Sequence, residues 1–92
     1  GILDSSEHVT VNLVPLSGGE ISEIVVGGHT IAVDAMDELT SIVNTRLQGG
    51  ATDVHLRADR ATKYSYIHQA IEAIRAVGTT PRVQLVVDGE YQ

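Results

Sequence analysis

The chain has 92 residues, of which 42% are hydrophobic and 3% aromatic, and its formal net charge is −6 at pH 7. This length indicates a single domain over residues 1–92, and the acidic balance argues against nucleic acid as a partner, because phosphate binding needs a basic face. The chain has no cysteine, which excludes disulfides, thiolate catalysis and cysteine-based zinc sites. It also lacks Phe and Trp, so the core must be aliphatic.

The first part of the chain predicts two strands joined by a turn. Apolar and polar residues alternate over 9–13, which is the period of a half-buried strand. Residues 15–19 read Pro-Leu-Ser-Gly-Gly, a turn signal, and 21–26 form a second apolar run. We therefore expect an antiparallel hairpin, with a bulge or burial on both faces near the end of its second strand. The glycine pair at 27–28 interrupts that strand, and 31–33 form a short extended segment.

A first helix is predicted over 35–48. Asp34 is the expected N-cap, because its carboxylate can accept a free backbone N–H of the first turn. The glycine pair at 49–50 should end the helix. Its apolar positions recur at helical spacing and comprise Leu39, Ile42, Val43 and Leu47, with Met36 beside them.

The second half predicts a strand, a helix and a further strand. Alternation over 53–58 indicates a half-buried strand, and an apolar stripe at helical spacing indicates a helix over 63–77. Gly78 stands where a left-handed C-terminal cap belongs. A turn at 79–81 then leads to the last strand, over 83–87.

These elements predict an α+β fold with two layers. The strand–helix–strand unit of the second half should place its two strands parallel, as neighbours or near-neighbours. Each helix has one apolar stripe, so both can cover a single face of a mixed sheet of four to five strands. We expect the edges of this sheet to include the hairpin or the last strand. The positions predicted to be buried are Leu39, Ile42, Val43, Leu56, Ile67, Ile71, Ile74 and Leu85.

No motif for catalysis or metal binding is found in the sequence. None of the four histidines is spaced four residues from another, and His68 with Glu72 is typical of a solvated helix pair. No serine has a nucleophile-elbow context, and the glycine doublets suit turns rather than phosphate loops. We therefore predict no enzyme activity, no catalytic residue, no metal site and no cofactor.

Three residues stand out as a possible contact site for a partner: Arg57, Asp59 and Tyr64. Asp59 can accept backbone N–H groups in the turn before the second helix. Tyr64 can lay its ring on the sheet and leave its hydroxyl in water. A structural role therefore accounts for these residues, and the functional alternative is that this corner contacts a partner protein or the cell wall.

Several of these segments resemble the periplasmic domain of the ExbD/TolR family of biopolymer-transport proteins. The strand ending in Arg57-Ala58-Asp59, the helix beginning near Tyr64 and the closing Ala76-Val77-Gly78 match that family's pattern. Upstream, residues 24–31 read Ile-Val-Val-Gly-Gly-His-Thr-Ile and are similar to its strand, glycine turn and following apolar residue. The matched segments cover most of residues 24–78.

The resemblance implies a non-enzymatic domain of a single-pass inner-membrane protein, on the periplasmic side of a Gram-negative-type cell. It implies a homodimer, an ExbB/TolQ-type partner bound through an N-terminal transmembrane helix absent from this chain, and contact with a TonB/TolA-type protein or peptidoglycan. In that family the complex uses proton flow to energise the TonB/TolA-type protein. The proton-conducting residue would lie in the missing helix.

A different function class remains open. Small α+β domains also act as regulatory modules that bind an amino acid or a similar effector, and glycine-rich turns such as 27–28 could serve that purpose. A small hydrolase is a third class, which the absence of a nucleophile motif disfavours.

Overall fold

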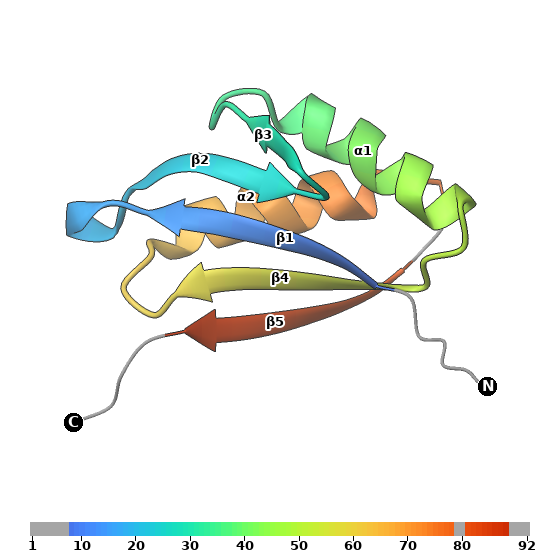
Figure 1. The fold of residues 1–92 in the computed structure, drawn as a ribbon. Coiled ribbons are helices and arrows are strands. Elements are labelled where there is room, and N and C mark those ends of the chain that lie inside the picture. The colour runs from blue at the N-terminus through green and yellow to red at the C-terminus, as the bar shows by residue number, and fades with distance from the viewer. Residues whose placement is uncertain (1–7, 79–80, 89–92) are drawn as a thin grey trace.

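The computed structural model describes residues 8–78 and 81–88, which form one mixed five-stranded sheet and two helices (Figure 1). In chain order the elements are β1 (His8–Pro15), η1 (Ser17–Gly19), β2 (Ile21–Val26), β3 (His29–Ile31), α1 (Met36–Gln48), β4 (Asp53–Asp59), α2 (Tyr64–Arg75) and β5 (Arg82–Asp88). Figure 1 shows both helices on the same side of the sheet. The fold is the predicted two-layer α+β arrangement. The turn predicted at Thr79 and Thr80 lies outside the described residues.

The strands are ordered β3-β2-β1-β4-β5 across the sheet. β1 pairs antiparallel with β2, and β2 pairs antiparallel with β3, whereas β1, β4 and β5 run parallel to one another. The hairpin of β1 and β2 is confirmed, but both of its strands lie inside the sheet, so of the two alternatives predicted for an edge the last strand is confirmed and the hairpin is wrong. The edges of the described sheet are the short β3 and the longer β5.

The hairpin follows from alternation along β1 and β2. Val11 and Leu13 are buried on the helix side, opposite Val26 and Ile24 of β2. The register shifts between Val14 and Pro15, so the irregularity lies at the turn end of the hairpin rather than near Val26. The three consecutive apolar residues of β2 are explained without a bulge, because the middle one, Val25, lies on the opposite face and is only partly buried.

α1 begins one residue later than predicted and without a side-chain cap. Ala35 is the N-cap residue and makes no side-chain bond to the helix. The backbone N–H of Ala35 bonds the carbonyl of Ala32 at 3.0 Å, which places Asp34 inside a turn before the helix and makes its predicted capping role wrong. Further along α1, the hydroxyl of Thr40 donates to the carbonyl of Ala73 on α2 at 2.8 Å and ties the two helices together.

α2 ends through a right-handed turn rather than a left-handed cap. Its C-cap residue is Ala76, with φ −73° and ψ −11°. The N–H groups of Ala76 and Val77 bond back to the carbonyls of Glu72 and Ile74 at 3.0 and 3.4 Å. These bonds satisfy the helix end, so Gly78 has no positive φ and its predicted capping role is wrong.

The core lies between the helix layer and the sheet. Of the eight positions predicted to be buried, Ile42 and Ile71 are only partly buried and pack against the core. Leu85 is 44% exposed, so its predicted burial is wrong. Neither helix extends behind β5 in Figure 1, and on the helix side of this strand Val83 packs against the core whereas Leu85 and Val87 are exposed. The predicted positions that are fully buried are Leu39, Val43, Leu56, Ile67 and Ile74.

Candidate functional site

The three residues predicted to form a contact site do not form one cluster. Arg57 and Asp59 lie two positions apart on β4, on the sheet face away from the helices, and both line one crevice. Tyr64 is the first residue of α2 and is 67% exposed, so its ring does not lie on the sheet as predicted. Its ring instead lies 6.0 Å from that of His68, with the two ring planes tilted by 40°. A partner site would therefore combine Arg57 and Asp59 without Tyr64.

Arg57 forms a bidentate ion pair with Asp88. Its Nε and Nη2 atoms donate to the two carboxylate oxygens of Asp88 at 3.2 and 2.8 Å, across the parallel pair of β4 and β5. The hydrogen bond from Arg57 lowers the pKa of the Asp88 carboxyl below its usual range, and the same bond raises the pKa of Arg57. Sequence reasoning missed Asp88, because the two residues are 31 positions apart and only the parallel register brings them together.

Asp59 has the structural role predicted for it. Its Oδ2 atom accepts the backbone N–H of Ala61 at 2.9 Å, and the N–H of Thr62 bonds the Asp59 carbonyl at 2.9 Å. These two bonds form the turn that leads from β4 toward α2. The other carboxylate oxygen has no hydrogen-bond partner among the described residues, so Asp59 keeps an acceptor beside the crevice.

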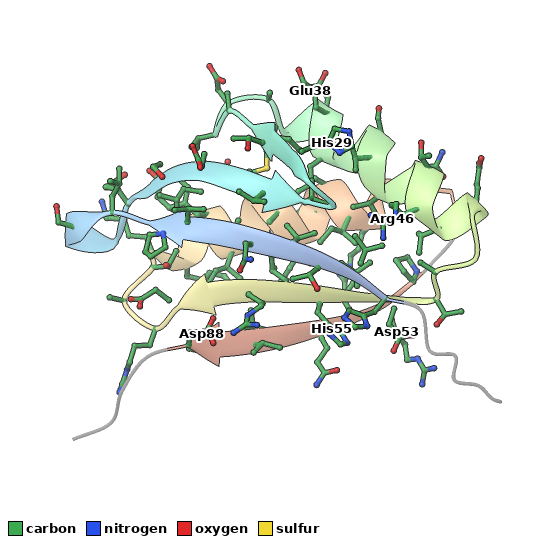
Figure 2. All side chains as sticks on the ribbon, viewed as in Figure 1. His29, Glu38, Arg46, Asp53, His55 and Asp88 are labelled. Atoms are coloured by element: carbon green, nitrogen blue, oxygen red, sulfur yellow. The ribbon has the colours of Figure 1, made fainter. Side chains whose placement is uncertain are left out.

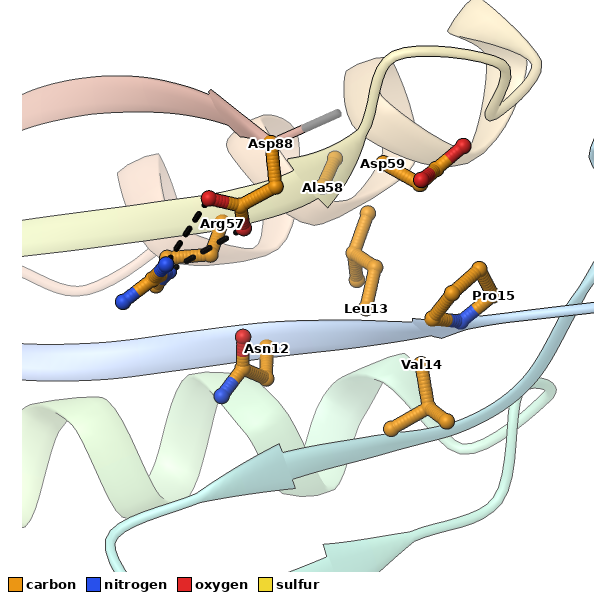
Figure 3. Close-up of a pocket in the computed structure, with 8 residues that line it drawn as sticks. All are labelled: Asn12, Leu13, Val14, Pro15, Arg57, Ala58, Asp59 and Asp88. Carbon is orange, nitrogen blue, oxygen red and sulfur yellow. Dashed lines mark hydrogen bonds and ion pairs between the residues drawn. The ribbon is translucent and has the colours of Figure 1, made fainter. Parts of the chain in front are cut away.

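The crevice lies where β1 and β4 diverge (Figure 3). Figure 3 shows Arg57 and Asp59 toward opposite ends of the opening, with Leu13 in the gap between the two strands. Asn12 on β1 lies on the Arg57 side of the gap. The remaining lining residues are Val14, Pro15, Ala58 and Asp88. The crevice thus combines an apolar floor with an arginine–aspartate pair, a free amide and a second carboxylate.

A second polar cluster, which sequence reasoning missed, joins η1 to α2. The Nζ atom of Lys63 donates to Glu20 at 2.5 Å, and the hydroxyl of Tyr66 donates to the other oxygen of the same carboxylate. The backbone N–H of Lys63 also bonds the carbonyl of Gly19 at 2.9 Å. The bonds from Lys63 and Tyr66 lower the pKa of Glu20, and the same contacts raise the pKa values of Lys63 and Tyr66. This cluster fastens the β1–β2 connection to the start of α2.

No strand of the described part of the chain pairs with the outer edge of β5, and this strand has two exposed apolar side chains. Leu85 and Val87 are 44% and 47% exposed. Leu85 lies in register with the buried Leu56 of β4, so its side chain is on the helix side of the sheet. The N–H of Arg82 and the carbonyl of Asp88 bond the β4 side, to Thr52 and Arg60 respectively.

Backbone polar groups of successive strand residues point to alternate sides. Those of Val83, Leu85 and Val87 therefore face the open edge of β5, opposite the sides used by Arg82 and Asp88. Their three side chains share the helix side of the sheet. An incoming strand could consequently bond these backbone groups and cover the apolar side chains in one step.

The histidines are dispersed over the fold. His8 and His55 stack on the open face of the sheet, with ring centroids 4.1 Å apart, while His68 lies 3.7 Å from Glu72 on α2. Figure 2 shows His55 and Asp53 near the start of β4, far from His29 beside α1. Within residues 8–78 and 81–88, no three His, Cys, Asp or Glu side chains lie close enough together to hold a metal ion.

None of the helices in the described part of the chain is long and apolar enough to cross a membrane. Comparisons with family models, curated proteins and solved structures found no match to this chain. Two features of the molecule could take part in binding: the outer edge of β5 and the crevice between β1 and β4.

Proposed function

We propose that this domain is a non-enzymatic interaction module that pairs with a second copy of itself through the free edge of β5. One observation carries the proposal. The backbone groups of Val83, Leu85 and Val87 face outward, and two of these residues, Leu85 and Val87, also have exposed apolar side chains on the helix side of the sheet. Exposed strand edges pair readily with other strands, and proteins that keep them unpaired usually place charge or proline there. The outward positions of β5 carry neither.

The sequence of β5 is complementary to itself in the antiparallel direction. If the twofold axis passes through Leu85, then Val83 of one copy lies opposite Val87 of the other, and each such pair exchanges backbone hydrogen bonds. In this register Arg82 of one copy lies opposite Asp88 of its partner, twice in the dimer. The Nε atom of Arg82 lies 3.6 Å from a carboxylate oxygen of Asp53 in its own chain, and its side chain is 85% exposed, so it remains accessible to such a contact. This register also overlaps all seven residues of β5.

The setting we propose follows the resemblance to ExbD/TolR-type proteins. The domain would lie in the periplasm, anchored by a transmembrane helix N-terminal to this chain, and a proton-driven ExbB/TolQ-type partner would bind that helix. The edge of β5 would then serve dimerisation, and contact with a TonB/TolA-type protein or with peptidoglycan would involve the assembled dimer. The outer edge of β5 supports a binding role, because an unpaired strand can accept another strand.

Sedimentation velocity over a concentration series tests the pairing. The wild-type domain should shift from monomer toward dimer as its concentration rises, and Leu85→Lys should weaken the dimer by about tenfold or more, because it places charge on the pairing edge. Leu16→Lys is the matched control, since Leu16 is 53% exposed and lies outside β5. A wild-type protein that stays monomeric at all concentrations, or equal effects of the two substitutions, would overturn the proposed edge.

Charge reversal tests the register. Arg82→Glu alone would oppose two carboxylates at each end of the dimer. Asp88→Arg alone would oppose two guanidinium groups there and would also break the pair with Arg57 within each copy. Mixing the two variants should restore association, because a heterodimer then has opposite charges at both ends. If the mixture associates no better than either variant, the register centred on Leu85 is wrong. If Leu85→Lys has no effect but a TonB/TolA-type peptide protects the edge, the edge receives a different strand.

A further inference from the structure

The crevice lies at a point where two neighbouring parallel strands part. The β1–β4 ladder ends at the pair Asn12 and Arg57. Beyond it β1 continues beside β2 as far as Pro15, and β4 continues beside β5 as far as Asp59. From β1 the chain turns into β2, toward one edge of the sheet, and from β4 it passes through α2 to β5, toward the other edge. In open sheets with parallel strands, ligands bind at such points, outside the carboxyl ends of the strands.

We infer that this crevice binds a free α-amino acid, with the ligand carboxylate at Arg57 and Asn12 and its ammonium group at Asp59. This site lies on the sheet face away from the helices, whereas the apolar side chains of the proposed dimer edge lie on the helix side. The inference therefore goes beyond the proposed pairing function and does not depend on it.

Donors for the carboxylate gather at the Arg57 end. A guanidinium has five N–H groups, and the bonds to Asp88 use only two of them. The side chain of Asn12 is exposed and has no hydrogen-bond partner among the described residues, so its amide can donate as well. Arginine is suited to carboxylates because its planar fork can bond both oxygens.

An acceptor for the ammonium group lies at the Asp59 end. Asp88 is neutralised by Arg57, whereas Asp59 has no cationic partner among the described residues, and one of its oxygens is unbonded. The crevice therefore has a surplus negative charge opposite its free donors. A ligand with one charge of each sign suits this arrangement better than a simple anion or a simple cation.

The size of the crevice suits a small ligand. Arg57 and Asp59 are two residues apart on one strand face, which is a separation of about 6.6 Å between their backbones. The cavity volume is about 260 Å³, below the range of roughly 300–1,000 Å³ usual for drug-sized ligands. The apolar side chains of Val14 and Pro15 can contact the ligand's side chain.

The test is an NMR titration of the folded domain with L-alanine and L-leucine, compared with propionate and ethylamine, which each carry only one of the two charges. We expect saturable shifts of the backbone amides of residues 12–14 and 57–59 with the amino acids, at a dissociation constant on the order of 1 mM, because exposed ion pairs are weak. The half-ligands should bind at least about tenfold more weakly. Absence of saturation, or equal binding of a half-ligand, would overturn the inference.

Two substitutions assign the ends of the site. Arg57→Gln and Asp59→Asn should each weaken amino-acid binding about tenfold or more. Asn keeps an oxygen that can accept the N–H of Ala61, so the turn after β4 should survive the second change. Arg75→Gln and Glu23→Gln remove the same charges outside the crevice and should leave binding unchanged. If the two pairs of variants bind alike, the site is elsewhere. Leu85→Lys, which blocks the proposed dimer edge, should still bind the amino acid, so the two proposals fail independently.

Discussion

At the scale of single residues, Glu20 connects two parts of the chain that are far apart in sequence. It lies just after η1 and accepts hydrogen bonds from Lys63 and Tyr66 at the beginning of α2. Lys63 and Glu20 are 43 positions apart, so no local pattern could have predicted their contact. The same contact explains why Tyr66 rather than Tyr64 is the partly buried tyrosine. The structure buries Ala70 and Ala73 and leaves Ile71 only partly buried, so the buried face of α2 is rotated by part of a turn from the predicted positions.

The pH dependence of stability follows from the bonds to Glu20. These bonds hold the pKa of Glu20 in the folded state below its value in the unfolded chain. The Glu20 carboxylate therefore contributes fully to the free energy of unfolding above the ordinary pKa of Glu, near pH 4.3, and this contribution is lost as the pH falls through the lower pKa of the folded state. Glu20→Gln should therefore lower the free energy of unfolding at pH 7 and have a smaller effect near pH 3. Urea unfolding at both values measures this. Glu23→Gln is the control, and an equal loss at both pH values for Glu20→Gln would contradict the assignment.

At the scale of elements, local periodicity predicted the helices and strands and their order. The alternation along β4 was also predicted correctly, since Leu56 is buried and Arg57 is exposed on the opposite face. The errors arose where burial depends on a neighbour that lies elsewhere in the chain. Alternation correctly placed Leu85 on the face of Leu56, but only the positions of the helices decide whether that face is covered. The crevice could not be predicted either, because it depends on where the β1–β4 ladder ends.

The two inward isoleucines of α2 give a graded test of its packing. Ile74 is fully buried, whereas Ile71 is only partly buried beside the core. Ile74→Ala should cost about 2–5 kcal/mol of unfolding free energy, from lost transfer energy and the cavity left behind, and Ile71→Ala should cost less. Chemical denaturation of the two variants measures the difference. An equal or larger loss for Ile71→Ala would show that α2 is rotated relative to the sheet.

At the scale of the whole molecule, the proposed dimer joins two sheets into one of ten strands with both helix layers on the same side. His8, Asp53 and Arg82 lie in one row at the beginning of β1, β4 and β5. With the twofold axis at Leu85, the two copies of His8 would be about 24 Å apart across the sheet and about 20 Å apart along the strands, or roughly 30 Å in all. A pair of anchors preceding β1 could span this distance with short linkers, so tethering would favour the pairing.

Tethering the domain should therefore change the hydrogen exchange of alternate residues in β5. We would fuse a parallel two-stranded coiled coil to the N-terminus through a Gly/Ser linker of about a dozen residues, which leaves slack over the required span. The effective concentration of the second copy then rises, so a weak pairing becomes populated. The amides of Val83, Leu85 and Val87, which face the open edge, should exchange more slowly than in the untethered domain. The amides of Gln84 and Val86, which face β4, should change little. The fusion carrying Leu85→Lys is the control, and unchanged exchange at all the outward amides would contradict pairing through this edge.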